Sequence, residues 1–518
     1  MKNKKILFGL AVCALVLVCM TAGCVDSTTD MSNTLVYAGE GVDSINPIFD
    51  THGELTTVVF SGLMTYDVNN QPIVDLAESY TYDEKNMTYT FILKKGVTWH
   101  DGEPFTADDV VFTYNTMMTD AAVSSSVRSD YEDIATVTAP DDYTIVVTMD
   151  KYNAAMLDYF SLGILPKHLL EGKDIATDSF NQNPIGTGKY KLVDWDTAGG
   201  MIVLERNTDY YGKIPSIERV IYKTVGVEST KATMLMTGEA DLAWLNSNYA
   251  KQFRGKDGYT NYDFQTADYR GAAMDFRTQF WKENGDSVGV LNYAIDKDAI
   301  VDSVLDGRGI VAFSPMQLNS YGGDTAADIY SYNLTKFAEE MEKLGWVKGS
   351  DGIYERNGQK FHFTIQTRDY EEERVDIANL MSQMLETAGV DMEVVLVTKF
   401  DWNSGYNGFL AGYATEYDPD MMYAQFTTNG SSNTMKYSNA EVDKILTEAR
   451  HESNPGVRKQ LYGEFEQVFA ETPGVLLTAY LQGNYVGIDG LSGLNTDKLL
   501  GHHAVGVMWN IEEWTLSK

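Results

Sequence analysis

The chain has 518 residues, of which 44% are hydrophobic and 22% are charged, and its formal net charge at pH 7 is -34. This length and apolar content suit about two to four domains with large cores and exclude wholesale disorder. The negative charge repels phosphates and anionic lipid headgroups, so it disfavours a nucleic-acid partner.

The N-terminus has the pattern of an export signal. Three lysines precede an apolar run from Ile6 to Met20, an order typical of a signal peptide (1–23) rather than of a spanning helix. The segment TAGC (21–24) resembles a lipobox, which predicts lipidation at Cys24 and a polar tether over 24–33. A single membrane-spanning anchor is the alternative.

The cysteines agree with this interpretation. All three, Cys13, Cys19 and Cys24, lie in or at the end of the leader. The mature body is therefore expected to have no internal disulfide, no thiolate metal site and no cysteine nucleophile.

The first half of the chain is predicted to be rich in strands. We expect strands at 34–39, 87–94, 143–149, 201–207 and 217–225, a helix at 54–64, and a helix followed by a short strand within 229–244. These assignments rest on alternating or helical spacing of apolar residues.

A second pattern begins near residue 270. We expect two helical stretches within 288–307, helices at 333–346 and 372–389, strands at 361–367 and 390–397, then two further helices and a strand-like tail from about 481. The strand–helix–strand order indicates a second α/β lobe.

The stretch GVTWHDGEPFTADDVVFTY (96–114) places a tryptophan, a histidine and an aspartate side by side. Thr106 and Asp109 have the spacing of a capping box, and Val110 opens an apolar helical stripe. Trp99 is expected in the core, and His100 is interpreted as scaffold rather than as a ligand of a metal.

Motifs of catalysis are not found in the sequence. It contains no HExxH, GxSxG, Walker or complete EF-hand motif. The neighbouring histidines His502 and His503 suit the protein surface better than a metal site. No cofactor is predicted, and the chain is not expected to be an enzyme.

Six segments resemble, in order, the extracytoplasmic solute-binding proteins of the peptide/nickel ABC importer family (family 5). They are GVTWHDGEPFTADDVVFTY, FSGLMTYDVNNQPIVDLAESY, NPIGTGKYKL, MTGEADLAW, LNYAIDKDAIVDSVLDGRG and GYATEYDPD. The resemblance implies a short peptide ligand, delivery to an ABC permease with its ATPase, a monomer, and a lipid-anchored position outside the cell.

The fold implied by the resemblance is α/β, a two-lobe periplasmic-binding-protein fold of class II, cluster C type. Lobe I would comprise 34–75, 185–273 and 485–518, an extra subdomain of lobe I would comprise 76–184, and lobe II would comprise 274–484. Two crossing segments, 270–276 and 480–486, would join the lobes, which close around a ligand by a hinge.

The resemblance also implies binding residues. Arg368 would bind the peptide carboxylate through its planar fork. Glu416 would bind the α-ammonium, with Asp418 as the competing acid. Tyr413 and Trp402 would wall the side-chain pockets, and Glu54 and Phe112 would contribute from lobe I; packing or solvation is the alternative for each.

Two other kinds of function remain open. A nickel or nickel-chelate binding protein of the same family is the first, although 411–426 contains no histidine and Arg128 is displaced by several residues from the position of the family's arginine. The second kind comes from other classes: a secreted metal-dependent hydrolase, or a sensor or adhesion lipoprotein.

Overall fold

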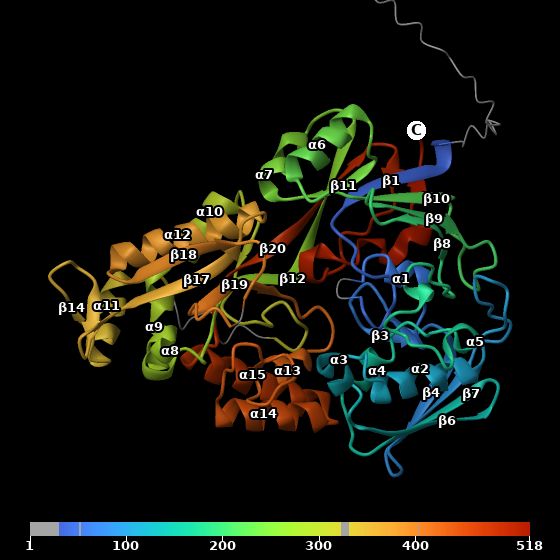
Figure 1. Cartoon of the computed structure of the whole chain (residues 1–518), viewed down its shortest axis with the longest axis horizontal. Coiled ribbons are helices and arrows are strands. Elements are labelled where there is room, and N and C mark those ends of the chain that lie inside the picture. Colours follow the sequence, from blue (N-terminus) through green and yellow to red (C-terminus); the bar gives the residue numbers. More distant parts are fainter. Residues whose placement is uncertain (1–30, 51–52, 323–330, 402) are drawn as a thin grey trace, which may run out of the picture.

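The computed structural model describes residues 31–50, 53–322, 331–401 and 403–518. The predicted signal peptide, Cys24 and Trp402 lie outside these ranges. Two lobes stand side by side, and strands β12 and β20 run between them (Figure 1). No helix within the described ranges is long and apolar enough to cross a membrane.

One large sheet extends through both lobes. Its strand order is β18-β17-β19-β12-β20-β11-β1-β10-β9-β8, with β13 also paired to β20. The bounds are β18 Asp391–Val397, β17 His362–Arg368, β19 Gly408–Tyr413, β12 Tyr259–Met274, β20 Val475–Ile488, β11 Leu242–Leu245, β1 Thr34–Gly39, β10 Arg219–Thr224, β9 Met201–Arg206, β8 Tyr190–Asp196 and β13 Ile310–Val311. We call the part from β11 to β8 lobe I and the part from β18 to β19 lobe II.

Strand β20 contains the predicted crossing segment 480–486, and β12 contains residues 270–274 of the predicted segment 270–276. Their antiparallel register shifts between Gln265 and Tyr269 and again between Arg270 and Gly271. On one side of the first shift β20 also pairs with β11, and on the other side β12 pairs with β19. The irregularity therefore lies at the boundary between the lobes, where a β-bulge bends a strand and redirects its side chains.

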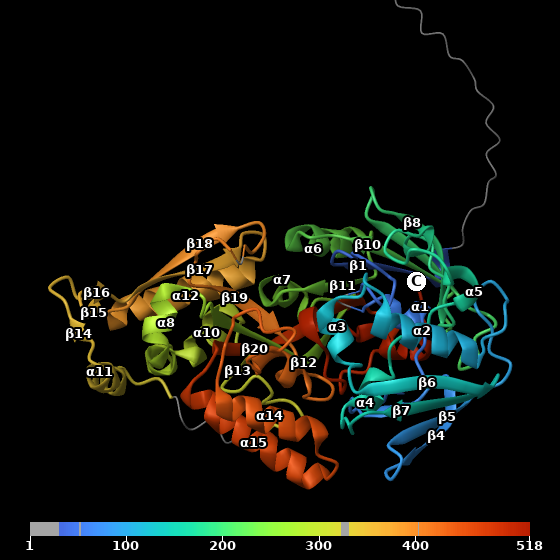
Figure 2. The ribbon, with the colours of Figure 1, turned by 60° about the horizontal axis from the view of Figure 1, so that its bottom comes forward.

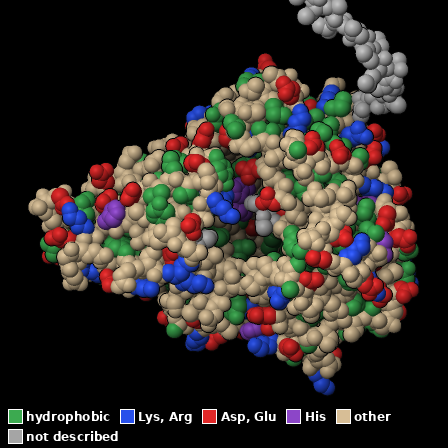
Figure 3. All heavy atoms as spheres, viewed as in Figure 1, with side chains coloured by type: hydrophobic (Ala, Val, Ile, Leu, Met, Phe, Trp, Pro, Cys, Tyr) green, Lys and Arg blue, Asp and Glu red, His purple; other side chains and the backbone are tan. Residues whose placement is uncertain are grey.

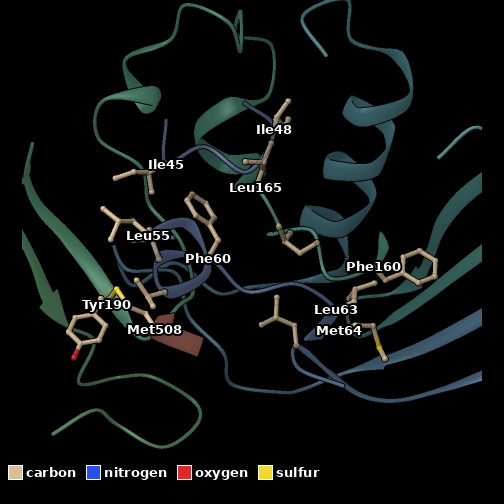
Figure 4. Packing of buried hydrophobic residues seen from close by; sticks show 14 of the residues in the cluster. Ile45, Ile48, Leu55, Phe60, Leu63, Met64, Phe160, Leu165, Tyr190 and Met508 are labelled. Atoms are coloured by element: carbon tan, nitrogen blue, oxygen red, sulfur yellow. The ribbon is translucent and has the colours of Figure 1, made fainter. Parts of the chain in front are cut away.

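The extra subdomain has its own sheet, in the order β4-β5-β7-β6. Its strands are β4 Ala77–Asp83, β5 Thr88–Leu93, β6 Ile134–Asp141 and β7 Thr144–Met149, and its helices are α2 Ala107–Thr119, α3 Ser125–Ser129, α4 Met156–Tyr159 and α5 Lys167–Leu170. A small hairpin of β2 Met64–Tyr66 and β3 Pro72–Val74 lies between this subdomain and lobe I in the chain. The subdomain shares one continuous hydrophobic core with lobe I (Figure 4).

Lobe II buries both faces of its part of the sheet. Leu476 belongs to one hydrophobic core and Leu477 to another, because successive side chains of β20 point to opposite faces. The helices that supply these cores are α8 Gln279–Asn284, α9 Val288–Leu291, α10 Lys297–Val304, α11 Leu334–Lys343, α12 Glu372–Ala388, α13 Met421–Phe426, α14 Ala440–His451 and α15 Pro455–Glu471. A small sheet of β14 Val347–Lys348, β15 Tyr354–Arg356 and β16 Gln359–Lys360 lies at the far end of the lobe (Figure 2).

The remaining elements complete lobe I. Helices α6 Glu228–Thr237 and α7 Ser247–Ala250 pack around β11, and α1 Thr56–Val59 lies in the core. After β20 the chain forms β21 Leu491–Ser492, the 3-10 helices η7 His502–Ala504 and η8 Val507–Glu513, and β22 Thr515–Leu516. The predicted strand-like pieces of the tail correspond to the end of β20 and to the short strands β21 and β22, whereas the 3-10 helices η7 and η8 between β21 and β22 were not predicted.

The predicted helix at 54–64 is wrong over most of its length. Only Thr56–Val59 is helical, and Phe60 has the extended angles φ -115° and ψ 156°. Leu55, Val58, Leu63 and their apolar neighbours are all buried, because this segment crosses the middle of the lobe I core. Its apolar residues reflect burial on every side rather than one helical face.

The stretch 96–114 is scaffold, as the sequence predicted. The capping box of Thr106 and Asp109 opens α2, and Trp99 is 1% exposed. His100 uses both ring nitrogens within the fold: Nδ1 accepts from the Gly186 amide at 3.2 Å, and Nε2 lies 3.1 Å from the Gly188 carbonyl oxygen. A Cβ at either glycine would collide with the backbone of α1. Residues 186–188, the GTG of the sequence motif, therefore pack directly against that backbone.

We expect Asp109→Ala to lower the stability of the protein by about 2 to 4 kcal/mol. The Asp109 carboxylate accepts from the amides of Thr106 and Lys167, both at 3.0 Å, and its removal leaves these partly buried donors unpaired. Thermal unfolding followed by circular dichroism measures the loss. Asp108→Ala, which removes an exposed partner of Lys167, is the control and should cost less than about 1 kcal/mol; equal effects would contradict the assignment.

Candidate functional site

The main cleft is a cavity of about 340 Å³ between the two lobes. It is lined by Glu40, Gly41, Asp43, Gly226, Glu228, Trp244, Leu245, Asn246, Arg270, Arg368, Tyr370, Glu371, Glu372, Glu373, Arg374, Leu481, Gln482 and His503. Figure 3 shows a hollow between the lobes where acidic, basic and histidine side chains gather. We call this cavity the main cleft.

The topology explains why these residues meet. Segments of the lining follow the parallel strands β1 and β10, and others follow β11 and β17. The carboxyl ends of strands in an open α/β sheet form the usual crevice for ligands. Each lobe therefore presents loop and helix-start residues to the same space.

Three arginines line the main cleft. Arg368 ends β17, its Nη1 lies 2.9 Å from Glu371 Oε1, and its guanidinium stacks 5.0 Å from the ring centre of Phe400. Arg374 and Arg270 are buried, at 3% and 4% exposure. Arg368 is the most accessible of the three, with a side-chain exposure of 35%, so it is the arginine best placed to meet a ligand anion.

Arg270 belongs to a buried charge network at the lobe boundary. It pairs with Asp268, which also accepts from the His503 amide at 2.9 Å and lies 2.9 Å from His502 Nδ1. Burial alone would raise the pKa of Asp268, but Arg270 and His502 hold it well below its usual range. The Asp268 carboxylate therefore links the β-bulge of β12 to η7 of the C-terminal tail.

His503 reaches the main cleft from η7. Its side chain is 10% exposed, and its Nδ1 lies 3.0 Å from Glu40 Oε2. His503 and Ala504 have φ values of 55° and 54°, a left-handed conformation that is uncommon for residues other than glycine. The prediction of surface histidines is therefore wrong for His503, because the fold turns the tail back into the cleft.

A second cavity, of about 330 Å³, contains the predicted acids Glu416 and Asp418. Both oxygens of Asp418 are bound by Arg458, at 2.5 and 2.6 Å, so this carboxylate is satisfied within lobe II. Burial raises the pKa of Glu416 to about 7. Of the two acids in this loop, the structure leaves Glu416 as the stronger candidate, although it does not line the main cleft.

The other predicted site residues are dispersed. Tyr413 is half-buried beside Tyr269, with ring centres 6.1 Å apart. Phe112 is half-buried on α2 and packs against the core of lobe I, so a role in lining the main cleft is not supported. Glu54 lines a small pocket that adjoins the main cleft. Of the predicted residues, Arg368 lines the main cleft and Glu54 lines the small pocket beside it.

The sequence interpretation missed Arg270, Arg374, Trp244 and Gln482. Arg270 and Gln482 lie in the two crossing segments, whose recognition could have drawn attention to them. Within the described ranges there is no group of three or more histidine, cysteine or acidic residues that could hold a metal ion.

The lobes also touch away from the main cleft. Arg450 of α14 lies 3.1 Å from Glu132 of the extra subdomain and 3.1 Å from Asp420 of its own lobe. The Tyr159 hydroxyl donates to Asp420 at 2.6 Å from the subdomain side. Figures 1 and 2 both show α14 next to the subdomain. Arg450 is 1% exposed, so this contact is a buried polar bridge that exists only when the lobes are together.

We expect Arg450→Met to open the lobes, because it removes the ion pair with Glu132 across the interface and leaves the buried Asp420 without its cation. Small-angle scattering should show a larger radius of gyration than for the wild type. Lys297→Met is the control, since Lys297 is also a buried cation, at 4% exposure, but donates to the Ala312 carbonyl oxygen inside lobe II. It should lower the melting temperature without opening the lobes; a closed Arg450→Met protein would contradict the prediction.

Comparison with known proteins places this geometry in a family. Residues 71–436 match the family described as bacterial extracellular solute-binding proteins, family 5. Two curated relatives are each 28% identical: Protein XP55 of Streptomyces lividans (91% of this chain and 88% of the relative) and the oligopeptide-binding protein AppA of Bacillus subtilis (90% and 88%).

Two solved structures are also similar. NikZ from Campylobacter jejuni in complex with Ni(L-His) is 32% identical, with a TM-score of 0.87 over 93% of this chain and 99% of that chain. AppA from Bacillus subtilis in complex with a nonapeptide is 26% identical, with a TM-score of 0.82 over 94% and 99%. The predicted two-lobe α/β fold is confirmed by these likenesses.

Proposed function

This chain belongs to family 5 of the bacterial extracellular solute-binding proteins, and from that premise we propose that it captures short peptides in the main cleft. It would deliver them to the permease and ATPase of an ABC importer. It would bind its ligand without chemical change, as a monomer held outside the cell by a lipid on Cys24. The lipid anchor, the monomeric state and the absence of catalysis are parts of this proposal.

The observation that carries the proposal is the accessible Arg368 in an interlobe cavity of about 340 Å³. Small-molecule sites have volumes of about 300 to 1,000 Å³, so the cavity as it stands suits a ligand of two or three residues. A planar guanidinium can bind a carboxylate through two hydrogen bonds. Closure of the lobes would then remove both partners from water.

We expect Arg368→Ala to weaken the binding of dipeptides with a free carboxylate by about 10- to 100-fold, the usual cost of a charge-assisted hydrogen bond. Amidated dipeptides should lose little. Isothermal titration of purified protein with both forms measures the difference, and the ligand recovered afterwards should be intact.

Arg277→Ala is the matched control for this experiment. Arg277 has a side-chain exposure of 34%, similar to Arg368, and pairs with Asp275 at 2.8 Å in the same lobe, but it is not part of the cleft lining. Its loss should leave both affinities unchanged. Equal weakening of free and amidated dipeptides by Arg368→Ala would show that this arginine does not bind the carboxylate.

A nickel–histidine complex is the second candidate ligand, favoured by the position of His503. NikZ, the relative at 32% identity, was solved with Ni(L-His), and His503 supplies an imidazole at the main cleft. Imidazole is a preferred nitrogen ligand of nickel. The chelating histidine would have to supply most of the remaining donors, and Arg368 could bind its carboxylate.

Thermal shift separates the two candidates. A ligand at 100 times its Kd stabilises the native state by about 2.7 kcal/mol. We expect dipeptides to produce such a shift in the wild type and in His503→Ala alike, because the proposed peptide contacts do not need the imidazole. A shift produced only by nickel with L-histidine, and lost in His503→Ala, would replace the peptide with the chelate.

A further inference from the structure

We propose that a small side pocket of lobe I binds a primary ammonium group of the ligand, with the carboxylate of Glu54 as its counter-ion. This inference rests on the proposed peptide function and adds to it the class of ligand and its orientation. It assigns the ammonium to lobe I rather than to the loop that contains Glu416.

The side pocket is a branch of the main cleft. Five residues line both spaces: Glu40, Gly41, Asp43, Trp244 and His503. The branch has a volume of about 30 Å³, and about 10 to 15 Å³ measured in this way holds one water molecule. It therefore has room for one or two groups the size of water, which suits an ammonium but not a guanidinium or an aromatic ring.

Within the described part of the chain, the carboxylate of Glu54 has one oxygen without a hydrogen-bond donor. The residue is 7% exposed, and its Oε2 accepts from the Gly506 amide at 2.7 Å. Its Oε1 is buried and has no hydrogen-bond partner among the described residues. A buried carboxylate with an empty acceptor is costly in free energy, and a cationic donor that enters from the cleft would remove that cost.

The walls of the pocket suit a cation. Tyr37, Tyr222 and Tyr485 line it, and the rings of Tyr37 and Tyr222 lie 4.9 Å apart in an edge-to-face arrangement. The hydroxyls of Tyr222 and Tyr485 donate to the carbonyl oxygens of Glu40 and Ala504, both at 2.9 Å. With those hydroxyls engaged, the walls present aromatic carbon, whose ring faces attract ammonium groups.

The side pocket and the main cleft differ in the charged residues that line them. Among the described residues, the titratable groups around Glu54 are Glu40, Asp43, Asp50, His503, Tyr37, Tyr222 and Tyr485, so acids outnumber bases in this part of the pocket lining. The three arginines line the main cleft on lobe II and the crossing strand, beside the lobe II acids Glu371, Glu372 and Glu373. A zwitterion would bind with its carboxylate toward Arg368 and its ammonium toward Glu54, so that closure pairs both charges.

Burial raises the pKa of Glu54 to about 7, with nearby Asp50 acting in the same direction and the backbone amides of Gly506, Val507 and Met508 acting against it. Near neutral pH the protonated and ionised forms of this carboxyl therefore coexist in the free protein. Binding of an ammonium favours the ionised form and should release a fraction of a proton per ligand. The affinity for an ammonium ligand should therefore rise between pH 5 and pH 8. At the lower pH the carboxyl of the unliganded site is protonated, and it must lose that proton before it can pair with the ammonium.

The test uses three probes that all carry a free carboxylate. Ala-Ala has only an α-ammonium, N-acetyl-Ala-Lys has only a side-chain ammonium, and N-acetyl-Ala-Ala has neither. We expect wild type to bind one of the first two about 10- to 100-fold more tightly than the third. The preferred probe identifies the source of the ammonium.

Glu54→Gln keeps the volume of the side chain and an oxygen for the Gly506 amide, but it removes the charge. It should erase the preference for the ammonium probe and leave the binding of N-acetyl-Ala-Ala unchanged. Asp43→Asn, at an exposed acid on the pocket rim, should reduce the preference by about 2- to 5-fold and is a second variant that does not disturb the core. Glu84→Gln, in the exposed turn after β4, is the control.

Titration calorimetry at pH 7 in two buffers of different ionisation enthalpy measures the released proton. The release should occur with the ammonium probe in wild type and vanish in Glu54→Gln. Unchanged selectivity and proton release in Glu54→Gln would overturn the inference, and so would a loss caused by Glu416→Gln in its place. If wild type binds none of the three probes, the peptide function itself fails.

Discussion

The antiparallel pairing of β12 with β20 is the interaction on which both lobes depend. These strands carry one sheet from lobe I into lobe II, and their register shifts where the lobes meet. The shift has two consequences, because a bulge both bends a strand and re-aims its side chains. It bends the sheet where the lobes meet, and it sets Asp268 and Arg270 beside η7 of the C-terminal tail, with Arg270 lining the main cleft.

Buried charged side chains lie both at the contact between the lobes and in the cavities. At the bridge between α14 and the extra subdomain, Arg450 pairs with Glu132 across the interface and with Asp420 of its own lobe. In the main cleft the arginines of lobe II lie beside acids of the same lobe, and Arg368 pairs with Glu371, whereas the side pocket of lobe I is lined by acids and His503 and by no described arginine or lysine. Charges removed from water need partners, so a ligand that brings an ammonium to the side pocket and a carboxylate to Arg368 would supply a partner at each end.

Much of the fold could be predicted from the sequence. The strand at 34–39 and the helix at 372–389 match β1 and α12 closely, because their apolar spacing reflects burial of one or both faces. The capping box at Thr106 follows from local chemistry alone. The helix at 54–64 failed because that segment is buried on every side, which removes the difference between faces on which periodicity depends. Arg368 was found only through the family resemblance.

The sequence by itself determined the local elements, the scaffold nature of Trp99 and His100, and the family. Only the tertiary structure decided which charged residues share a cavity. Glu40, Trp244, Arg368 and His503 come from four distant parts of the chain and meet because strand ends from both lobes face one crevice. Nothing in the local sequence of His503 distinguishes it from a surface histidine. Its position depends on the Asp268 carboxylate that holds the tail, a contact between residues 235 positions apart.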